Sequence, residues 1–137
     1  MRPAFDALFA VDDAMADVVL TATQPALAAI KLAWWRESLE KLDREPAPAE
    51  PRLQAVVREL LPQGVSGRDL AQLEMGWLAL LEEVPSWEAV TERGVVLFSL
   101  AQRLLGASGD LAETGRAWAC VDLARRTGER QWLGEPE

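Results

Sequence analysis

Histidine is absent from this chain of 137 residues, and cysteine occurs once, as Cys120. The absence of histidine excludes serine–histidine and cysteine–histidine catalysis and classical zinc sites, and one cysteine cannot form an internal disulfide. Any chemistry must therefore be carried by carboxylates, arginines or a bound metal. Nothing around Cys120 marks an activated thiolate, so we expect a small buried hydrophobic residue there.

Basic residues are scarce relative to acidic ones. The 14 lysines and arginines stand against 22 aspartates and glutamates, which gives a formal net charge of -8. This balance disfavours contact with a nucleic-acid backbone, so no nucleic-acid partner is expected. An anionic ligand would need a local basic pocket or bridging metal ions.

Long apolar runs are missing as well. No stretch reaches the roughly 18 uninterrupted apolar residues of a transmembrane helix, and the N-terminus lacks the pattern of a signal peptide. We expect a cytoplasmic location, with peripheral association with a membrane as an open alternative. The composition, 50% hydrophobic and 26% charged, is that of a single globular domain over residues 1–137.

Strand signals are nearly absent, since tyrosine is missing and no Asn-Gly or Asp-Gly turn occurs. Apolar residues instead recur at helical spacing throughout, and proline and glycine divide the chain into about six segments. We therefore predict an all-α fold. The expected helices cover approximately residues 3–21, 25–42, 51–61, 66–85, 86–106 and 110–128, with a proline-rich connector over 44–51 and a frayed tail beyond 128.

The first helix carries an unusual set of aspartates. Asp6, Asp13 and Asp17 lie opposite its apolar side. Asp13 and Asp17 are four residues apart, the spacing that lets two carboxylates share a divalent cation, although a solvated acidic face is the simpler interpretation. Asp12 falls within the apolar side, where a carboxylate is costly unless it is paired, so we expect it to contact a cation or a polar cavity.

Tryptophan and arginine occur together in two of the predicted helices. In residues 34–37, Trp-Trp-Arg-Glu, we expect the tryptophans in the core and leave a cavity-facing role open for Arg36. The apolar residues of this helix cover two faces, which predicts packing on both sides. In the last helix, Asp122 and Arg125 have the spacing of a surface ion pair, and their place beside Trp118 leaves a cavity-facing role open.

Several segments follow one another in a recognisable order. They are Leu-Phe-Ala before Asp12 (8–12), Gln-Pro before Ile-Lys-Leu-Ala-Trp-Trp-Arg-Glu-Ser-Leu (24–39), Gly-Trp (76–77), Arg-Gly-Val-Val-Leu-Phe (93–98) with Leu-Leu-Gly (104–106), and Gly-Arg-Ala-Trp-Ala (115–119). This order resembles the squalene/phytoene synthase family, over nearly the whole chain but about the N-terminal half of a typical member. The chain is most similar to the bacterial and mitochondrial branch that includes a respiratory complex I assembly factor.

The resemblance implies a truncated, isoprenoid-synthase-like helical bundle around a central cavity. In active members, two aspartate-rich motifs on facing helices hold magnesium ions that bind prenyl diphosphates. Asp13 and Asp17 are the candidates for the first motif, whereas the assembly-factor branch would match Asp12 alone. Aligned on the Gly-Arg-Ala segment, the aspartates of the second motif fall at Arg126 and Arg130, and arginine cannot ligate magnesium.

We therefore expect a catalytically degenerate relative that binds an isoprenoid, a lipid or a protein partner, in the manner of an assembly factor, and that needs no cofactor. The alternative is an active magnesium-dependent prenyltransferase that condenses farnesyl or geranylgeranyl diphosphate, and a third is a plain helical scaffold. The candidate cavity residues are Asp12, Arg36, Trp118, Asp122 and Arg125. The family motif makes Arg36 the expected partner of Asp12.

The truncation also predicts self-association. In the family, the far wall of the cavity comes from the half of the chain that is missing here, so the inner faces of the helices would lie open. The residues expected on this exposed apolar surface are Trp34, Trp35, Leu97, Phe98 and Trp118. A homodimer would cover such a surface, whereas closure of the helices on one another is the alternative.

Overall fold

The computed structural model describes residues 2–134, and their side chains as far as residue 128. Within this range all regular structure is helical, which confirms the predicted all-α class. The elements are α1 (Arg2–Leu20), α2 (Pro25–Lys41), α3 (Pro51–Glu59), η1 (Leu61–Gln63), α4 (Gly67–Ala71), α5 (Leu73–Leu78), η2 (Ala79–Leu81), α6 (Trp87–Leu105) and α7 (Ala112–Gly134). The single helix predicted over 66–85 is divided into α4, α5 and η2, so about six helices result when α4 and α5 count as one.

Most helix ends follow from local capping chemistry. Pro25 begins α2, in the first turn, where the missing N–H of proline costs no intrahelical hydrogen bond. The Ser66 hydroxyl accepts from the backbone N–H of Asp69, whose carboxylate accepts from the Ser66 N–H, so the two residues form a capping box. Ser86 caps α6, and Gly106, with φ of 65° in the left-handed region, ends it.

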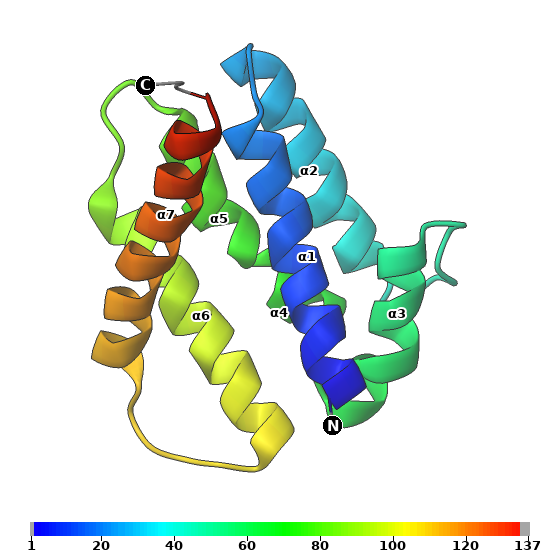
Figure 1. The fold of residues 1–137 in the computed structure, drawn as a ribbon. Helices are drawn as coiled ribbons and strands as arrows, with labels where there is room; N and C mark the ends of the chain where they lie inside the picture. Colours follow the sequence, from blue (N-terminus) through cyan, green and yellow to red (C-terminus); the bar gives the residue numbers. More distant parts are fainter. Residues whose placement is uncertain (1, 135–137) are drawn as a thin grey trace.

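The helices form a bundle around α1. Figure 1 shows α1 passing through the middle, with α2 and α3 on one side and α6 and α7 on the other, and α1 contacts α2, α3, α5 and α6. The helices α6 and α7 run in opposite directions and share the most extensive interface of the bundle. None of the described helices combines the length and apolar character needed for a membrane span.

The core runs along α1 and closes the space between the two sides of the bundle. Its largest fully buried side chains are Trp77, Leu8, Met15, Leu32, Leu39, Leu53, Leu60, Leu70, Leu73 and Leu97. Trp35 and Leu97 are buried, so the prediction that they lie on an exposed apolar surface is wrong. They join the core because the six segments close on one another. Phe98 and Trp118 are half-buried, and their rings contact each other with centroids 5.7 Å apart.

The prediction that α2 is packed on both sides is also wrong. One side of α2 contacts α1, α4 and α5, but Leu27, Ile30 and Trp34 lie on the open side, and Ile30 is 66% exposed. The reason is that no other described helix reaches that side.

A further difference from the sequence prediction is at the C-terminal end. There α7 continues past Gly128 to Gly134, where the sequence predicted a frayed tail. Residues 135–137 lie outside the described part.

A close helix crossing fixes α7 against α6. A Cβ atom added at Gly94 would lie 1.8 Å from the carbonyl oxygen of Gly115, so only glycine permits this approach of the two backbones. Ala119 follows one turn later and is buried in the same contact. The crossing brings the neighbouring residues Arg93 and Asp122 into the interior of the bundle.

Candidate functional site

Charged side chains occupy the middle of the bundle, where α1, α6 and α7 meet. We call them the central ion cluster, which consists of Asp12, Asp13, Arg93, Asp122 and Arg126. Its members come from α1 and from the consecutive helices α6 and α7, which lie far from α1 in the sequence, so the cluster exists only in the folded chain.

Asp12 is the innermost member, with 0% of its surface exposed. One carboxylate oxygen accepts a hydrogen bond from the Trp77 indole N–H at 2.9 Å, and the other accepts from Arg93 Nη1 at 2.6 Å. Arg126 Nη2 lies 3.7 Å from the second oxygen. The sequence prediction that Asp12 contacts a cation is confirmed, and both of its oxygens have a partner.

Arg93 links the two buried aspartates. Its side chain is 3% exposed, and Nη2 donates to Asp122 Oδ2 at 2.8 Å while Nη1 donates to Asp12. The guanidinium lies 4.2 Å from the ring centroid of Trp77 and 5.1 Å from that of Trp118, within range of cation–π attraction. Gly76 makes room, since a Cβ there would lie 2.6 Å from the Cβ of Arg93.

Arg126 closes the cluster at the surface. Its Nε donates to Asp122 Oδ2 at 2.8 Å, and its Nη2 donates to Asp13 Oδ1 at 2.7 Å. Arg125 Nη2 reaches Asp122 Oδ1 at 3.0 Å, so the predicted ion pair between these residues is confirmed, although Asp122 is buried and not on the surface. Three arginines therefore converge on one carboxylate.

Burial and hydrogen bonding set the pKa values of the cluster. Burial raises the pKa of Asp12 above its ordinary value, against the opposing effect of Arg93. Burial also raises the pKa of Asp122, but hydrogen bonds from Arg126 and Arg93 outweigh it and hold that pKa below its ordinary value. Burial lowers the pKa of Arg126, but hydrogen bonds to Asp122 and Asp13 outweigh it and raise that pKa. The hydrogen bonds between Asp122 and Arg126 therefore favour the charged forms of both groups.

Arg36 does not belong to this cluster. Its guanidinium lies 3.5 Å from the buried carboxylate of Glu74 and 3.4 Å from Glu37. The prediction that Arg36 pairs with Asp12 is therefore wrong, because the Asp12 side chain is turned toward α5 and α6 and its cation is Arg93. The signal for Arg93 was available in the sequence, since it lies three residues after Val90 and four before Leu97, on the buried side of α6.

The two weaker metal candidates on α1 do not act together. Asp13 and Asp17 are both exposed, as the solvated acidic face predicts. The Asp13 carboxylate binds Arg126, whereas Asp17 lies one turn further along and lines a separate polar cavity of about 160 Å³ at the α1–α2 turn. They therefore face different surroundings.

The residues of the central ion cluster do not fit a magnesium ion. Each oxygen of Asp12 and Asp122 already accepts a hydrogen bond, and three of the four accept from arginine. Arginine carries no lone pair to donate to a metal, and its charge repels a cation at the same oxygens. No group of three or more metal-ligating side chains occurs among the described residues. The side chain of Arg130 lies outside the described part.

An apolar cavity of about 550 Å³ lies beside the cluster, between the end of α1, η2, the start of α6 and one face of α7. Its lining residues are Val19, Leu20, Leu80, Trp87, Val90, Cys120, Leu123, Ala124 and Thr127. Cys120 is exposed there, so the prediction of a buried cysteine is wrong. The reason is that α7 contacts α6 through Gly115 and Ala119, which turns Cys120 toward the cavity.

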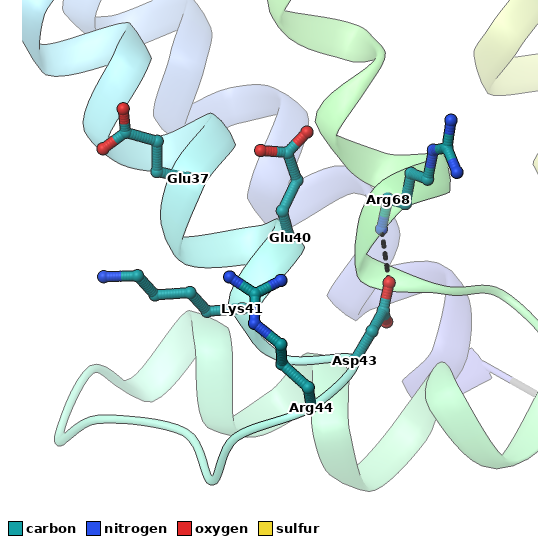
Figure 2. Close-up of a pocket in the computed structure, with 6 residues that line it drawn as sticks. All are labelled: Glu37, Glu40, Lys41, Asp43, Arg44 and Arg68. Carbon is teal, nitrogen blue, oxygen red and sulfur yellow. Dashed lines mark hydrogen bonds between the residues drawn. The ribbon is translucent and has the colours of Figure 1, made fainter.

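A second cavity, of about 460 Å³, is polar and lies between the end of α2 and α4 (Figure 2). It is lined by Glu37, Glu40, Lys41, Asp43, Arg44 and Arg68. Asp43 binds the backbone N–H groups of Gly67 and Arg68 and so serves to hold the start of α4. Figure 2 shows Lys41 and Arg68 extending in opposite directions, so the basic groups do not converge on one point.

Comparisons of this chain with protein-family models, with curated proteins and with solved structures found no match. We therefore argue its function from the geometry of the site and from the resemblance of its sequence segments.

Proposed function

We propose that this chain is a catalytically degenerate, squalene/phytoene-synthase-like module that binds the hydrocarbon chain of an isoprenoid or lipid and does not transfer prenyl groups. The observation that carries the proposal is the state of the two buried carboxylates. Asp12 and Asp122, from α1 and α7, are both held by Arg93.

This arrangement opposes the chemistry of a prenyltransferase. Ionisation of a prenyl diphosphate requires cations that neutralise the charge on the departing diphosphate. Here the cations are arginines that already neutralise aspartates, and Arg126 stands where the resemblance expects a metal-binding carboxylate. Breaking these pairs would leave buried charges without partners, at a cost of several kcal/mol per ion.

The apolar cavity supports the binding role. Its volume of about 550 Å³ falls within the range of about 300–1,000 Å³ that is typical of small-molecule sites. Each methylene group that leaves water for such a cavity contributes about 0.8 kcal/mol. A hydrocarbon chain therefore gains binding energy there without any polar contact.

A protein-binding role in the manner of an assembly factor is the second candidate. It is favoured by Leu27, Ile30 and Trp34, which follow one another at intervals of three and four residues along the open side of α2. This spacing is typical of a helix face that packs against another helix. The two roles use different surfaces of the chain and do not exclude each other.

The test combines a product assay with a binding assay on the same protein. With farnesyl diphosphate and magnesium we expect no squalene, presqualene diphosphate or phytoene above a control without protein. With farnesol present, we expect a thiol reagent to modify Cys120 more slowly, because Cys120 is the only cysteine of the chain and lines the cavity.

Two variants make the binding assay specific. Ala124→Trp fills the cavity and should abolish the protection of Cys120, whereas Val121→Trp places the same ring on an exposed position of α7 outside the lining and should leave it unchanged. Product formed above the control would establish the active prenyltransferase instead. Unchanged modification of Cys120 at every ligand concentration would remove the binding role.

A further inference from the structure

We infer that the ligand of the apolar cavity carries an uncharged head group, such as a hydroxyl or a carbonyl, and not a diphosphate. This inference rests on the proposed binding role and specifies the class of ligand. Three features of the cavity and its surroundings lead to it: the chemistry of the lining, the state of the neighbouring arginines and the charges on the adjoining surface.

The lining offers no charged group among the residues that the structure describes. Its polar side chains are Cys120, Thr127 and the indole of Trp87. The Thr127 hydroxyl donates to the carbonyl oxygen of Leu123 at 2.9 Å, within its own helix, so its oxygen still has capacity to accept. Such a group suits a ligand hydroxyl, but it cannot offset the desolvation of a charge.

The arginines that adjoin the lining residues of α7 are engaged elsewhere, since Arg125 and Arg126 both donate to Asp122. Arg126 precedes Thr127 in α7, and its guanidinium donates to Asp122 and Asp13. Arg93 is buried and donates to Asp12 and Asp122. A diphosphate would have to separate one of these arginines from its aspartates, and the displaced carboxylates would then repel the diphosphate.

The surface around the cavity adds to this repulsion. Glu88 follows the lining residue Trp87 on α6, and its carboxylate is exposed. Asp17 lines the separate polar cavity at the α1–α2 turn and does not take part. The C-terminal end of α1, which lines the cavity through Leu20, carries the negative end of the helix dipole. A cationic head gains no partner inside either, because no carboxylate lines the cavity.

The experiment compares ligands that share one chain and differ in the head group. Farnesol, farnesylamine and farnesyl diphosphate are added to the full chain, below the concentrations at which they form micelles, and the rate of Cys120 modification is measured with and without magnesium. We expect farnesol to give half-protection at a concentration at least about tenfold lower than the other two. Magnesium should not change the result for farnesyl diphosphate.

The outcomes separate this inference from the proposed function. If farnesyl diphosphate or farnesylamine protects Cys120 as well as farnesol does, the inference is wrong while the binding role stands. If none of the three ligands protects Cys120, the binding role itself fails. Protection by farnesol that is lost in Ala124→Trp and kept in Val121→Trp supports both.

Discussion

Arg93 is a buried arginine whose guanidinium lies between two buried carboxylates. Arg93→Met should lower the free energy of unfolding by about 3–5 kcal/mol, because it removes the cation between two buried carboxylates, Asp12 and Asp122. Asp12→Leu should cost less, since Arg93 keeps Asp122 as a partner and the apolar side chain suits the buried position. Urea unfolding followed by circular dichroism measures both values.

A surface ion pair supplies the control for this prediction. Arg116 binds Glu92 at 3.1 Å, with roughly half of each side chain exposed. Arg116→Met should therefore change the free energy of unfolding by less than about 1 kcal/mol. Equal losses for Arg93→Met and Arg116→Met would show that the buried arginine does not hold the bundle together.

The buried Glu74 should make the stability of the fold depend on pH. Burial raises its pKa above the ordinary value, against the opposing effect of Arg36. The folded state therefore binds this proton more tightly than the unfolded state, so the contribution of Glu74 to stability falls as the pH rises through the folded pKa. Glu74→Gln removes this effect, and its stability relative to the wild type should increase between about pH 4 and pH 7.

The exposed Glu83 gives the matched variant for this measurement. Glu83→Gln also removes one carboxylate from the chain, but at a position where the side chain is exposed. A stability of Glu74→Gln relative to the wild type that stays constant, or that decreases, as the pH rises would contradict the raised pKa.

Single residues were predictable from the sequence where the helix period decides their environment. The inward position of Asp12 followed from its place among apolar neighbours, and so did the need for a cation. The identity of that cation did not, because Arg93 lies 81 residues away and only the packing of α6 on α1 brings it there. Cys120 was misplaced for a similar reason, since its exposure depends on which face of α7 contacts α6.

At the scale of elements, the crossing of α6 and α7 is the most restrictive contact. Gly94→Ala should cost at least about 1–3 kcal/mol, because the new methyl group would overlap the backbone of Gly115. Gly128→Ala, in the same helix as Gly115 and with nothing within 4 Å of the new Cβ, should instead stabilise the chain by about 0.5–1 kcal/mol. Thermal unfolding of both variants checks the contrast, and a neutral Gly94→Ala would contradict the close approach.

The helix boundaries show which parts of the fold are local. Pro25, Ser66, Ser86 and Gly106 start or end helices by their own chemistry, so the sequence predicted those ends. The break between α4 and α5 carries no proline or glycine. It lies where successive residues are buried on more than one side, which is a consequence of tertiary packing that no single helical period reveals.

At the scale of the whole molecule, self-association remains a prediction, and the open side of α2 is the surface on which it depends. Ile30 is 66% exposed there, so Ile30→Lys should leave the fold intact while it disrupts any contact through this side. We expect light scattering to give a dimeric mass for the wild type and a monomeric mass for the variant. A monomeric wild type at all concentrations would contradict this expectation.

The central claim is that arginines neutralise the carboxylates between α1 and α7, so that they bind no divalent metal. Electron paramagnetic resonance of Mn²⁺ titrated into the wild type and into Asp122→Asn tests it most directly, because this substitution removes the carboxylate on which three arginines converge. We predict the same weak, surface-type binding for both proteins. One manganese ion bound per wild-type chain, and lost in Asp122→Asn, would contradict the claim.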